Sequence, residues 1–231
     1  YLDYFKYSLE NLSKGTTNSN VVSLSHIQVR DAAGFSFVSG GVDFLDLKHF
    51  SNTKSSGTIG MIGDSWIEAT HVFFTRRWAY KIYADQTAYK AYISGRGGQN
   101  TTGINDRIQL ELDAFNPEWV IVCAGYNDSN LSTWQAQLNS IISKIETNGA
   151  VPVICTLAPV DTANQLILTS QNTYIKGLGK RILNVAEAMT ISGDETTIDP
   201  SLMYVDDKHP NEDGHIEIYN KAKIDIPEIF S

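Results

Sequence analysis

Ser65 occupies a position in which its hydroxyl group could act as a nucleophile. It follows Gly63 and Asp64 at the end of a short apolar run, residues 58–62, and the pattern after it turns helical. A serine at the N-terminus of a helix can present its hydroxyl at the end of a strand, while its own backbone N–H points toward any negative charge that develops there. On these residues alone, a serine that merely caps a helix is the simpler interpretation.

A histidine and an aspartate much later in the chain could complete an acyl-transfer site. Such a site needs a hydroxyl nucleophile, a base that titrates near neutral pH, a group that orients the base, and donors for the oxyanion. His209 supplies an imidazole, and Asp206, in the same loop, could accept the proton of its far ring nitrogen. Asp207 is the alternative partner, but the spacing favours Asp206. We therefore predict Ser65, His209 and Asp206 as catalytic residues.

Three neutral N–H groups could stabilise an oxyanion beside Ser65. They are the backbone N–H groups of Ser65 and Gly98 and the side-chain amide of Asn127. Glycine at position 98 lets the backbone approach a substrate without a Cβ, and an amide costs less to desolvate than a charged donor. Gly98 and Asn127 both follow predicted strands, so we expect them at the same edge of a sheet as Ser65.

Strand and helix patterns alternate from residue 58 to the end of the chain. Strands are predicted at 58–62, 88–93, 119–124, 151–157 and 181–185, and helices at 68–85, 104–115, 133–147, 166–178 and 211–223. This alternation predicts an α/β fold in which helices cover both faces of a five-stranded parallel sheet. In such sheets the functional residues gather at the carboxyl ends of the strands.

Residues 1–57 differ from the rest and predict a small β-rich appendage to a main domain at 58–231. Short alternating runs at 21–30, 35–38 and 42–47 are separated by turn residues. Because a segment of this length would hardly sustain its own core, we expect it to pack on the main domain or to continue a β structure before Tyr1. A first residue other than Met leads us to expect a processed product or part of a longer chain.

Four short motifs in series resemble those of the SGNH (GDSL) hydrolases. Gly63-Asp64-Ser65 matches the first block, Gly98 within Gly-Gly-x-x-Thr-Thr the second, Gly125-x-Asn127-Asp128 the third and Asp206-x-x-His209 the last. The resemblance covers residues 58–223. It implies a three-layer α/β/α sandwich with a flavodoxin-like sheet, and ester hydrolysis that uses no metal and no organic cofactor.

Two positions depart from the family pattern. Trp66 stands where the family has leucine, which places an aromatic side chain next to the nucleophile. The second block contains an extra residue, Asn100, between Gly98 and Thr101. This insertion leaves Gly97 as an alternative backbone donor to Gly98.

Composition excludes several other classes of protein. The net charge of −8 and the absence of dense Lys/Arg clusters argue against binding to nucleic acid or to an anionic membrane surface. No apolar stretch is long enough to insert into a membrane. Cys123 and Cys155 lie in apolar runs without the spacing of a redox or metal site, so we expect two reduced thiols in the core.

The remaining conspicuous side chains have structural interpretations beside functional ones. Asp64 and Asp128 are expected to shape their loops rather than to take part in chemistry. His215 is expected to face the closing helix, and the other histidines to lie on the surface or in the core. Three aromatic residues in or beside the site loops could either stack on sugar rings or fill an apolar site: Trp66, Tyr126 and Tyr204.

The expected function is a serine esterase that removes a small acyl group, acetate above all, from a carbohydrate. The sequence has no long apolar insertion that could form a lipid lid, and phage tail spikes and bacterial polysaccharide deacetylases resemble this arrangement. We accordingly expect an extracellular or virion-associated protein, within a larger chain or a homo-oligomer. The alternatives are a lysophospholipase or thioesterase that uses the same residues, and a non-catalytic carbohydrate-binding module of a tail fibre or adhesin.

Overall fold

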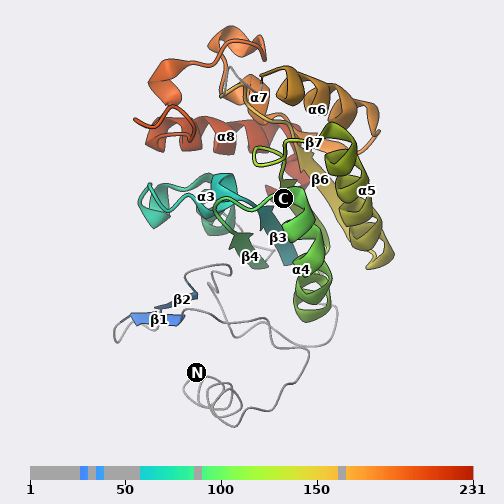
Figure 1. Ribbon diagram of the computed structural model, residues 1–231. Coiled ribbons are helices and arrows are strands. Elements are labelled where there is room, and N and C mark those ends of the chain that lie inside the picture. The colour runs from blue at the N-terminus through green and yellow to red at the C-terminus, as the bar shows by residue number, and fades with distance from the viewer. Residues whose placement is uncertain (1–26, 31–34, 39–57, 86–89, 161–164, 231) are drawn as a thin grey trace.

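The structure, a computed structural model, describes residues 27–30, 35–38, 58–85, 90–160 and 165–230. Its centre is a parallel sheet of five strands in the order β4-β3-β5-β6-β7 (Figure 1). Their bounds are β3 Thr58–Gly63, β4 Lys90–Gly95, β5 Trp119–Cys123, β6 Val151–Cys155 and β7 Arg181–Leu183. The predicted five-stranded parallel sheet and its flavodoxin-like order are confirmed, because the second strand of the domain lies outside the first and the rest follow in sequence.

Helices cover both faces of the sheet and give three layers (Figure 1). Successive residues of β5 explain this, since Ile121 and Cys123 join one buried cluster while Val120 and Val122 join the other. The first cluster packs against α2 (Ser65–Glu68), α3 (Trp78–Ala84), α7 (Val185–Ala188) and α8 (Glu212–Asp225). The second packs against α4 (Thr101–Phe115), α5 (Leu131–Thr147) and α6 (Gln165–Gly177).

The order of strands brings two loops to the same point of the sheet. β3 lies between β4 and β5. The chain therefore first adds β4 on one side of β3 and then crosses over to add β5 on the other side. In open α/β sheets, ligands bind at such a switch point, beyond the carboxyl ends of the strands. The loop after β3 carries Ser65, and the loop after β5 carries Asn127. The topology therefore places the two loops that carry these predicted site residues next to each other.

The predicted helix at 68–85 is wrong, because the structure breaks this stretch into three short pieces. α2 ends after Glu68, where Ala69 adopts the left-handed conformation (φ 48°) that terminates helices. A 3₁₀ turn, η2, spans Phe74–Arg76, and α3 begins only at Trp78. The break leaves residues 70–73 in an irregular segment between α2 and η2.

Both cysteines are buried and free, which confirms the predicted reduced core thiols.

Three further 3₁₀ turns follow α7 in the described part of the chain: η3 (Ile191–Gly193), η4 (Pro200–Leu202) and η5 (Pro227–Phe230). In the part of the chain that the structure describes, no helix has both the length and the apolar character that a bilayer crossing requires.

Little of the predicted N-terminal appendage falls within the described residues. β1 (Ile27–Arg30) and β2 (Phe35–Val38) pair antiparallel, as expected of a small β element. The predicted strand at 42–47 lies outside the described residues. The domain boundary at residue 57 stays a prediction.

Candidate active site

The nucleophile turn is shaped by the residues on both sides of Ser65. Asp64 caps α2, and its Oδ1 accepts the backbone N–H of Trp66 at 3.0 Å. Gly63 approaches β5 so closely that an added Cβ would lie 2.2 Å from the carbonyl oxygen of Cys123. Only glycine fits there. Ser65 is thus the first residue of a helix at the carboxyl end of β3, and its side chain is half-buried.

The structure brings the predicted serine, histidine and aspartate into one hydrogen-bonded chain. Nε2 of His209 lies 2.8 Å from Oγ of Ser65, although 144 positions separate the two residues. Nδ1 of His209 lies 2.6 Å from Oδ2 of Asp206. Because an ionised carboxylate only accepts, Nδ1 carries the hydrogen and Nε2 is free to accept from the serine hydroxyl. This is the tautomer that a general base requires.

Asp206 also organises the loop that carries the histidine. Its Oδ1 accepts the backbone N–H groups of Lys208 at 3.0 Å and His209 at 3.1 Å. Partial burial opposes ionisation, but these bonds and the one from the imidazole together hold the pKa of Asp206 below its usual value. Asp207, the alternative partner, sits at φ 54° in the turn, while both oxygens of Asp206 are engaged as described.

Besides the N–H of Ser65, the candidate oxyanion donors lie on the loop after β4 and on the loop after β5. The N–H of Gly97 is already used, since it donates to Oε2 of Glu68 at 2.6 Å. Gly98 has a φ of +73°, and an added Cβ would meet nothing within 4 Å. No hydrogen bond from the backbone N–H of Ser65 or Gly98 occurs among the described residues. Of the two glycines, Gly98 is therefore the one with a donor to spare.

Asn127 reaches across from its neighbouring loop to the same place. Its Nδ2 donates to the carbonyl of Gln99 at 3.1 Å. An amide nitrogen carries two hydrogens, so one remains for a ligand. Asp128 beside it accepts the N–H and the hydroxyl of Thr101 at 3.0 and 2.7 Å, which matches its expected structural part.

A buried arginine, which sequence reasoning missed, supports these loops from below. Nη2 of Arg107 donates to the carbonyls of Gly63 and Ser94 at 3.0 and 3.1 Å, and its Nε donates to Oε1 of Gln99 at 2.7 Å. Its charge is paired with Glu111 one turn later. The available signal was an Arg/Glu pair on the face of α4 that otherwise buries Ile104, Ile108 and Leu112. A paired charge on an apolar helix face indicates a buried contact rather than a solvated one.

Asp64 is fully buried beneath the nucleophile. Burial raises its pKa to about 7, despite the hydrogen bond from Trp66 that favours the charged form. Its second oxygen, Oδ2, has no hydrogen-bond partner among the described residues. A proton on that oxygen would relieve the cost of burying a charge.

Of the three aromatic residues that could meet substrate, Trp66 belongs to the core and Tyr126 packs against it. Trp66 is only 1% exposed, and it stacks on Tyr126 with ring centroids 4.5 Å apart. The hydroxyl of Tyr126 accepts the N–H of Ala158 at 2.7 Å. The prediction of a substrate contact is therefore wrong for Trp66, because its side chain is buried. Tyr126 is only partly buried, so its contact with substrate stays a prediction. Tyr204, in contrast, is 37% exposed beside the histidine loop.

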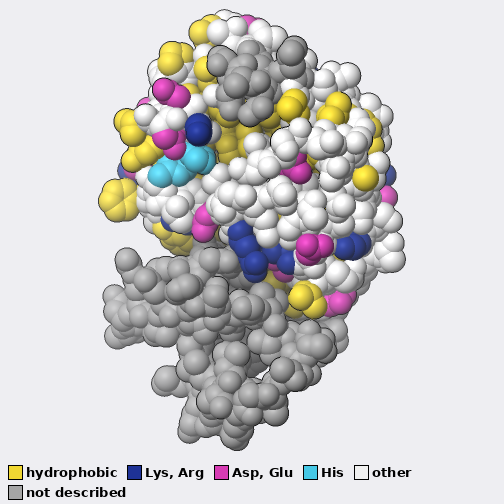
Figure 2. All heavy atoms as spheres, viewed as in Figure 1, with side chains coloured by type: hydrophobic (Ala, Val, Ile, Leu, Met, Phe, Trp, Pro, Cys, Tyr) yellow, Lys and Arg dark blue, Asp and Glu magenta, His cyan; other side chains and the backbone are white. Residues whose placement is uncertain are grey.

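His71 is a second residue that sequence reasoning missed. Its ring centroid lies 4.9 Å from that of His209, and its Nε2 lies 2.9 Å from the carbonyl oxygen of Pro210. The helix break after Glu68 directs this segment to the site, and a continuous helix would have hidden that contact. Figure 2 shows histidine side chains at the surface with acidic, basic and hydrophobic side chains around them.

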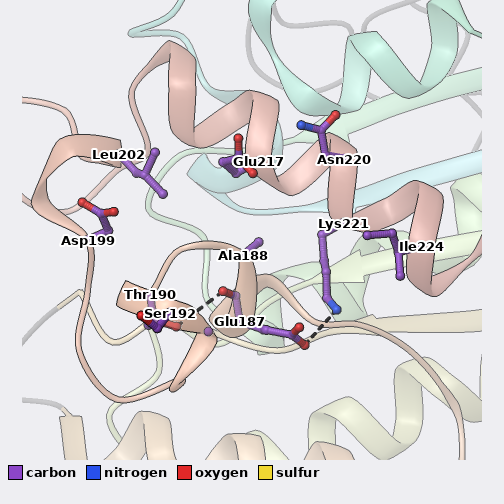
Figure 3. Close-up of a pocket in the computed structure, with 11 residues that line it drawn as sticks. Glu187, Ala188, Thr190, Ser192, Asp199, Leu202, Glu217, Asn220, Lys221 and Ile224 are labelled. Carbon is purple, nitrogen blue, oxygen red and sulfur yellow. Dashed lines mark hydrogen bonds and ion pairs between the residues drawn. The ribbon is translucent and has the colours of Figure 1, made fainter.

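A separate cavity of about 560 Å³ lies between α7, η4 and α8 (Figure 3). An ion pair between Glu187 and Lys221, at 2.8 Å, lies along its wall. None of Ser65, Asp206 and His209 lines it. The hydrogen-bonded chain therefore lies outside this cavity.

Among the described residues, no cluster of three or more acidic, histidine or cysteine side chains could hold a metal ion.

Comparison with known proteins agrees with this geometry. The model of the GDSL-like lipase/acylhydrolase family matches residues 61–215, which include every residue of the hydrogen-bonded chain. None of the curated proteins matches the sequence.

Solved structures share the fold at low sequence identity. A member of the lipolytic protein G-D-S-L family from Veillonella parvula is 16% identical, with a TM-score of 0.65 over 74% of this chain and 99% of that one. A psychrotrophic esterase from Pseudoalteromonas sp. is 19% identical, with a TM-score of 0.61 over 75% and 98%. A catalytic mutant of an acetylxylan esterase from Geobacillus stearothermophilus is 13% identical, with a TM-score of 0.63 over 76% and 96%.

Proposed function

The chain belongs to the GDSL-like lipase/acylhydrolase family, and from this premise we propose that it is a serine esterase that forms an acyl-enzyme on Ser65. The observation that carries the proposal is the unbroken chain of hydrogen bonds from Asp206 through His209 to the Ser65 hydroxyl. A nucleophile, a base and a group that orients the base are thus hydrogen-bonded in the order that a serine hydrolase uses, which supports the proposal.

The reaction follows from these contacts. His209 Nε2 takes the hydroxyl proton as Ser65 Oγ forms a bond to the ester carbonyl carbon, and the imidazolium is stabilised by Asp206. The tetrahedral intermediate collapses when the carbon–oxygen bond to the alcohol breaks and Nε2–H protonates the departing oxygen. Water then enters, gives a proton to Nε2 and attacks the acyl-enzyme. The acid leaves, and the proton returns to Oγ of Ser65.

The oxyanion would be held by the N–H groups of Ser65 and Gly98 and by the remaining amide hydrogen of Asn127. These donors are uncharged, and Asn127 is already held by its bond to Gln99, so little reorganisation of this side chain would be needed when negative charge appears. Gly97 makes no such contribution in this scheme, because its N–H is bonded to Glu68.

Replacing Asn127 with alanine is expected to lower kcat by about 10²- to 10³-fold with little change in KM, because the lost donor acts mainly on the transition state. Steady-state hydrolysis of p-nitrophenyl acetate measures this. Asn139→Ala is the matched control, since Asn139 is an exposed asparagine on α5 that bonds Tyr174, and it should keep the parental kcat. A kcat within about threefold of the parent in Asn127→Ala would remove this residue from the scheme.

For the substrate we propose a small acyl group, above all acetate, on a carbohydrate. The acetylxylan esterase among the solved structures supports this class, although it shares the fold alone. Tyr204 also supports it, because a partly exposed aromatic ring beside the base could stack on a sugar. A specific observation favours a second candidate with longer acyl chains: Phe73 and Val205 are 81% and 88% exposed on the two segments that flank His209.

Acetate release from acetylated polysaccharides, compared with hydrolysis of p-nitrophenyl esters of two to sixteen carbons, distinguishes these candidates. We expect the acetyl esters to be preferred. Tyr204→Ala should raise KM for an acetylated glycan by roughly tenfold while KM for p-nitrophenyl acetate stays unchanged, since the small ester has no sugar ring to stack. A preference for the long chains would replace the carbohydrate proposal with a lysophospholipase or thioesterase activity.

A further inference from the structure

His71 joins the segment after the nucleophile to the segment that carries the base. Its Nε2 lies 2.9 Å from the carbonyl oxygen of Pro210, across 139 positions of sequence. Pro210 directly follows His209, whose own carbonyl accepts the N–H of Tyr204 at 2.8 Å. Two successive backbone carbonyls are therefore held, that of the base itself by its own loop and that of Pro210 by His71.

The contact fixes the tautomer of His71. A backbone carbonyl can only accept, so Nε2 must carry the hydrogen, and Nδ1 is the bare nitrogen while the ring is neutral. Tyr204 packs against the same ring, with centroids 5.0 Å apart. Held by a hydrogen bond at one edge and by neighbouring rings, the imidazole has little freedom to move away from Pro210.

The surroundings of His71 favour its neutral form. Burial lowers its pKa, and the nearby charges of His209 and Arg77 act in the same direction, while Asp206 and the Pro210 carbonyl oppose them. On the inner side lies His215, which is fully buried and whose Nδ1 is bonded to the N–H of Trp78 at 3.4 Å. Burial lowers the pKa of His215 to about 3. Neutral rings behind the base do not repel the imidazolium that forms in catalysis.

We propose that His71 is a positioning residue for His209, which clamps the Pro210 carbonyl and so keeps the base in line with the Ser65 hydroxyl. This inference rests on the proposed function. The distance from His209 Nε2 to Ser65 Oγ is 2.8 Å, and a displacement of about 1 Å in such a contact can lower a rate by about 100-fold. The clamp connects the loop bearing the base to the turn after α2.

Two variants test the clamp. His71→Phe keeps a planar ring of similar size and removes the donor, and it should lower kcat for p-nitrophenyl acetate by roughly 10- to 100-fold with KM within about threefold. His71→Gln places an amide N–H where Nε2–H was and should restore kcat to within about threefold of the parent. Thermal unfolding of both variants checks that they are equally folded.

A second measurement does not depend on turnover. In ¹⁵N-histidine NMR spectra of the parent, His71 should appear as the Nε2–H tautomer, and the Nδ1–H proton of His209 should be protected by Asp206. His71→Phe should weaken that protection and His71→Gln should keep it. The clamp is refuted if the protection survives in the phenylalanine variant, or if both folded variants lose the same activity.

The two arms separate this inference from the proposed function. If hydrolysis by the parent did not depend on Ser65, the function would be wrong, and the NMR comparison would still decide whether His71 fixes His209. If hydrolysis depends on Ser65 but His71→Phe is as active as the parent, the function stands and the clamp is wrong.

Discussion

Replacing Ser65 with alanine is expected to lower kcat for ester hydrolysis by about 10⁴- to 10⁶-fold, because the acyl-enzyme can no longer form. The structure leaves no obvious substitute, since the imidazole of His209 is aimed at this hydroxyl. The measurement is release of p-nitrophenol from the acetate ester and of acetate from an acetylated glycan, with the uncatalysed rate subtracted. An organophosphonate that captures nucleophilic serines should label the parent and leave Ser65→Ala unmodified.

The matched control is Ser143→Ala, which removes a serine hydroxyl from an exposed position on α5. It should hydrolyse both substrates at the parental rate. Retention of activity in folded Ser65→Ala would contradict the acyl-enzyme scheme. It would leave open only a route in which water attacks the ester directly.

Replacing His209 with alanine is the second large effect, also expected at about 10⁴- to 10⁶-fold in kcat, since Ser65 then has no base. KM should change little, because the imidazole acts on the transition state more than on substrate binding. Circular dichroism should show an unchanged fold, since the His209 side chain is 24% exposed and supports no buried cluster.

The double variant Ser65→Ala/His209→Ala provides the sharper test. Residues that act as one unit give non-additive effects, so the double variant should be no slower than either single variant. Losses that multiply would show that serine and histidine act in separate steps, and the hydrogen bond between them would then be incidental to catalysis.

Most of the sheet and all of the hydrogen-bonded chain could be predicted from the sequence. The five strands are short apolar runs bounded by polar or glycine residues. Such continuous apolar runs are typical of strands that are buried on both faces of a parallel sheet. Ser65, Asn127 and His209 each sit where a strand or a loop ends, and motif order alone links them. What the sequence did not reveal is a distant contact outside these motifs, such as that of His71 with the Pro210 carbonyl.

The wrong predictions share one physical cause. Residues 68–85 contain enough apolar residues to suggest a single helix, yet Ala69 leaves helical geometry, and the segment after it contacts the loop at Pro210 through His71. Trp66 could have met substrate or filled an apolar site, and its place beside Ser65 did not decide between them; consecutive residues of a helix point in different directions, and position 66 faces the core. In both places tertiary packing, which local sequence does not reveal, determined the backbone conformation or the direction of the side chain.

The role of Asn100, the extra residue in the second motif block, became clear only from the structure. Asn100 caps α4, where its side chain accepts the N–H of Gly103 at 3.0 Å. The insertion thus belongs to the start of the helix, and the donors ahead of it remain in place. Gly97 is bonded to Glu68 and Gly98 is left for a ligand, which the motif alone could not decide.

The buried carboxyl group of Asp64 links folding to the uptake of a proton. In the unfolded chain its pKa has the ordinary value of 3.8, whereas in the folded protein it is about 7. Between these values the unfolded chain is ionised at this position and the folded one is not, so folding binds a proton from solvent. The resulting stability is fully present below the unfolded pKa and is lost as pH rises through about 7. The turn that presents the nucleophile therefore takes up a proton when the chain folds in mild acid, and it releases that proton in mild alkali.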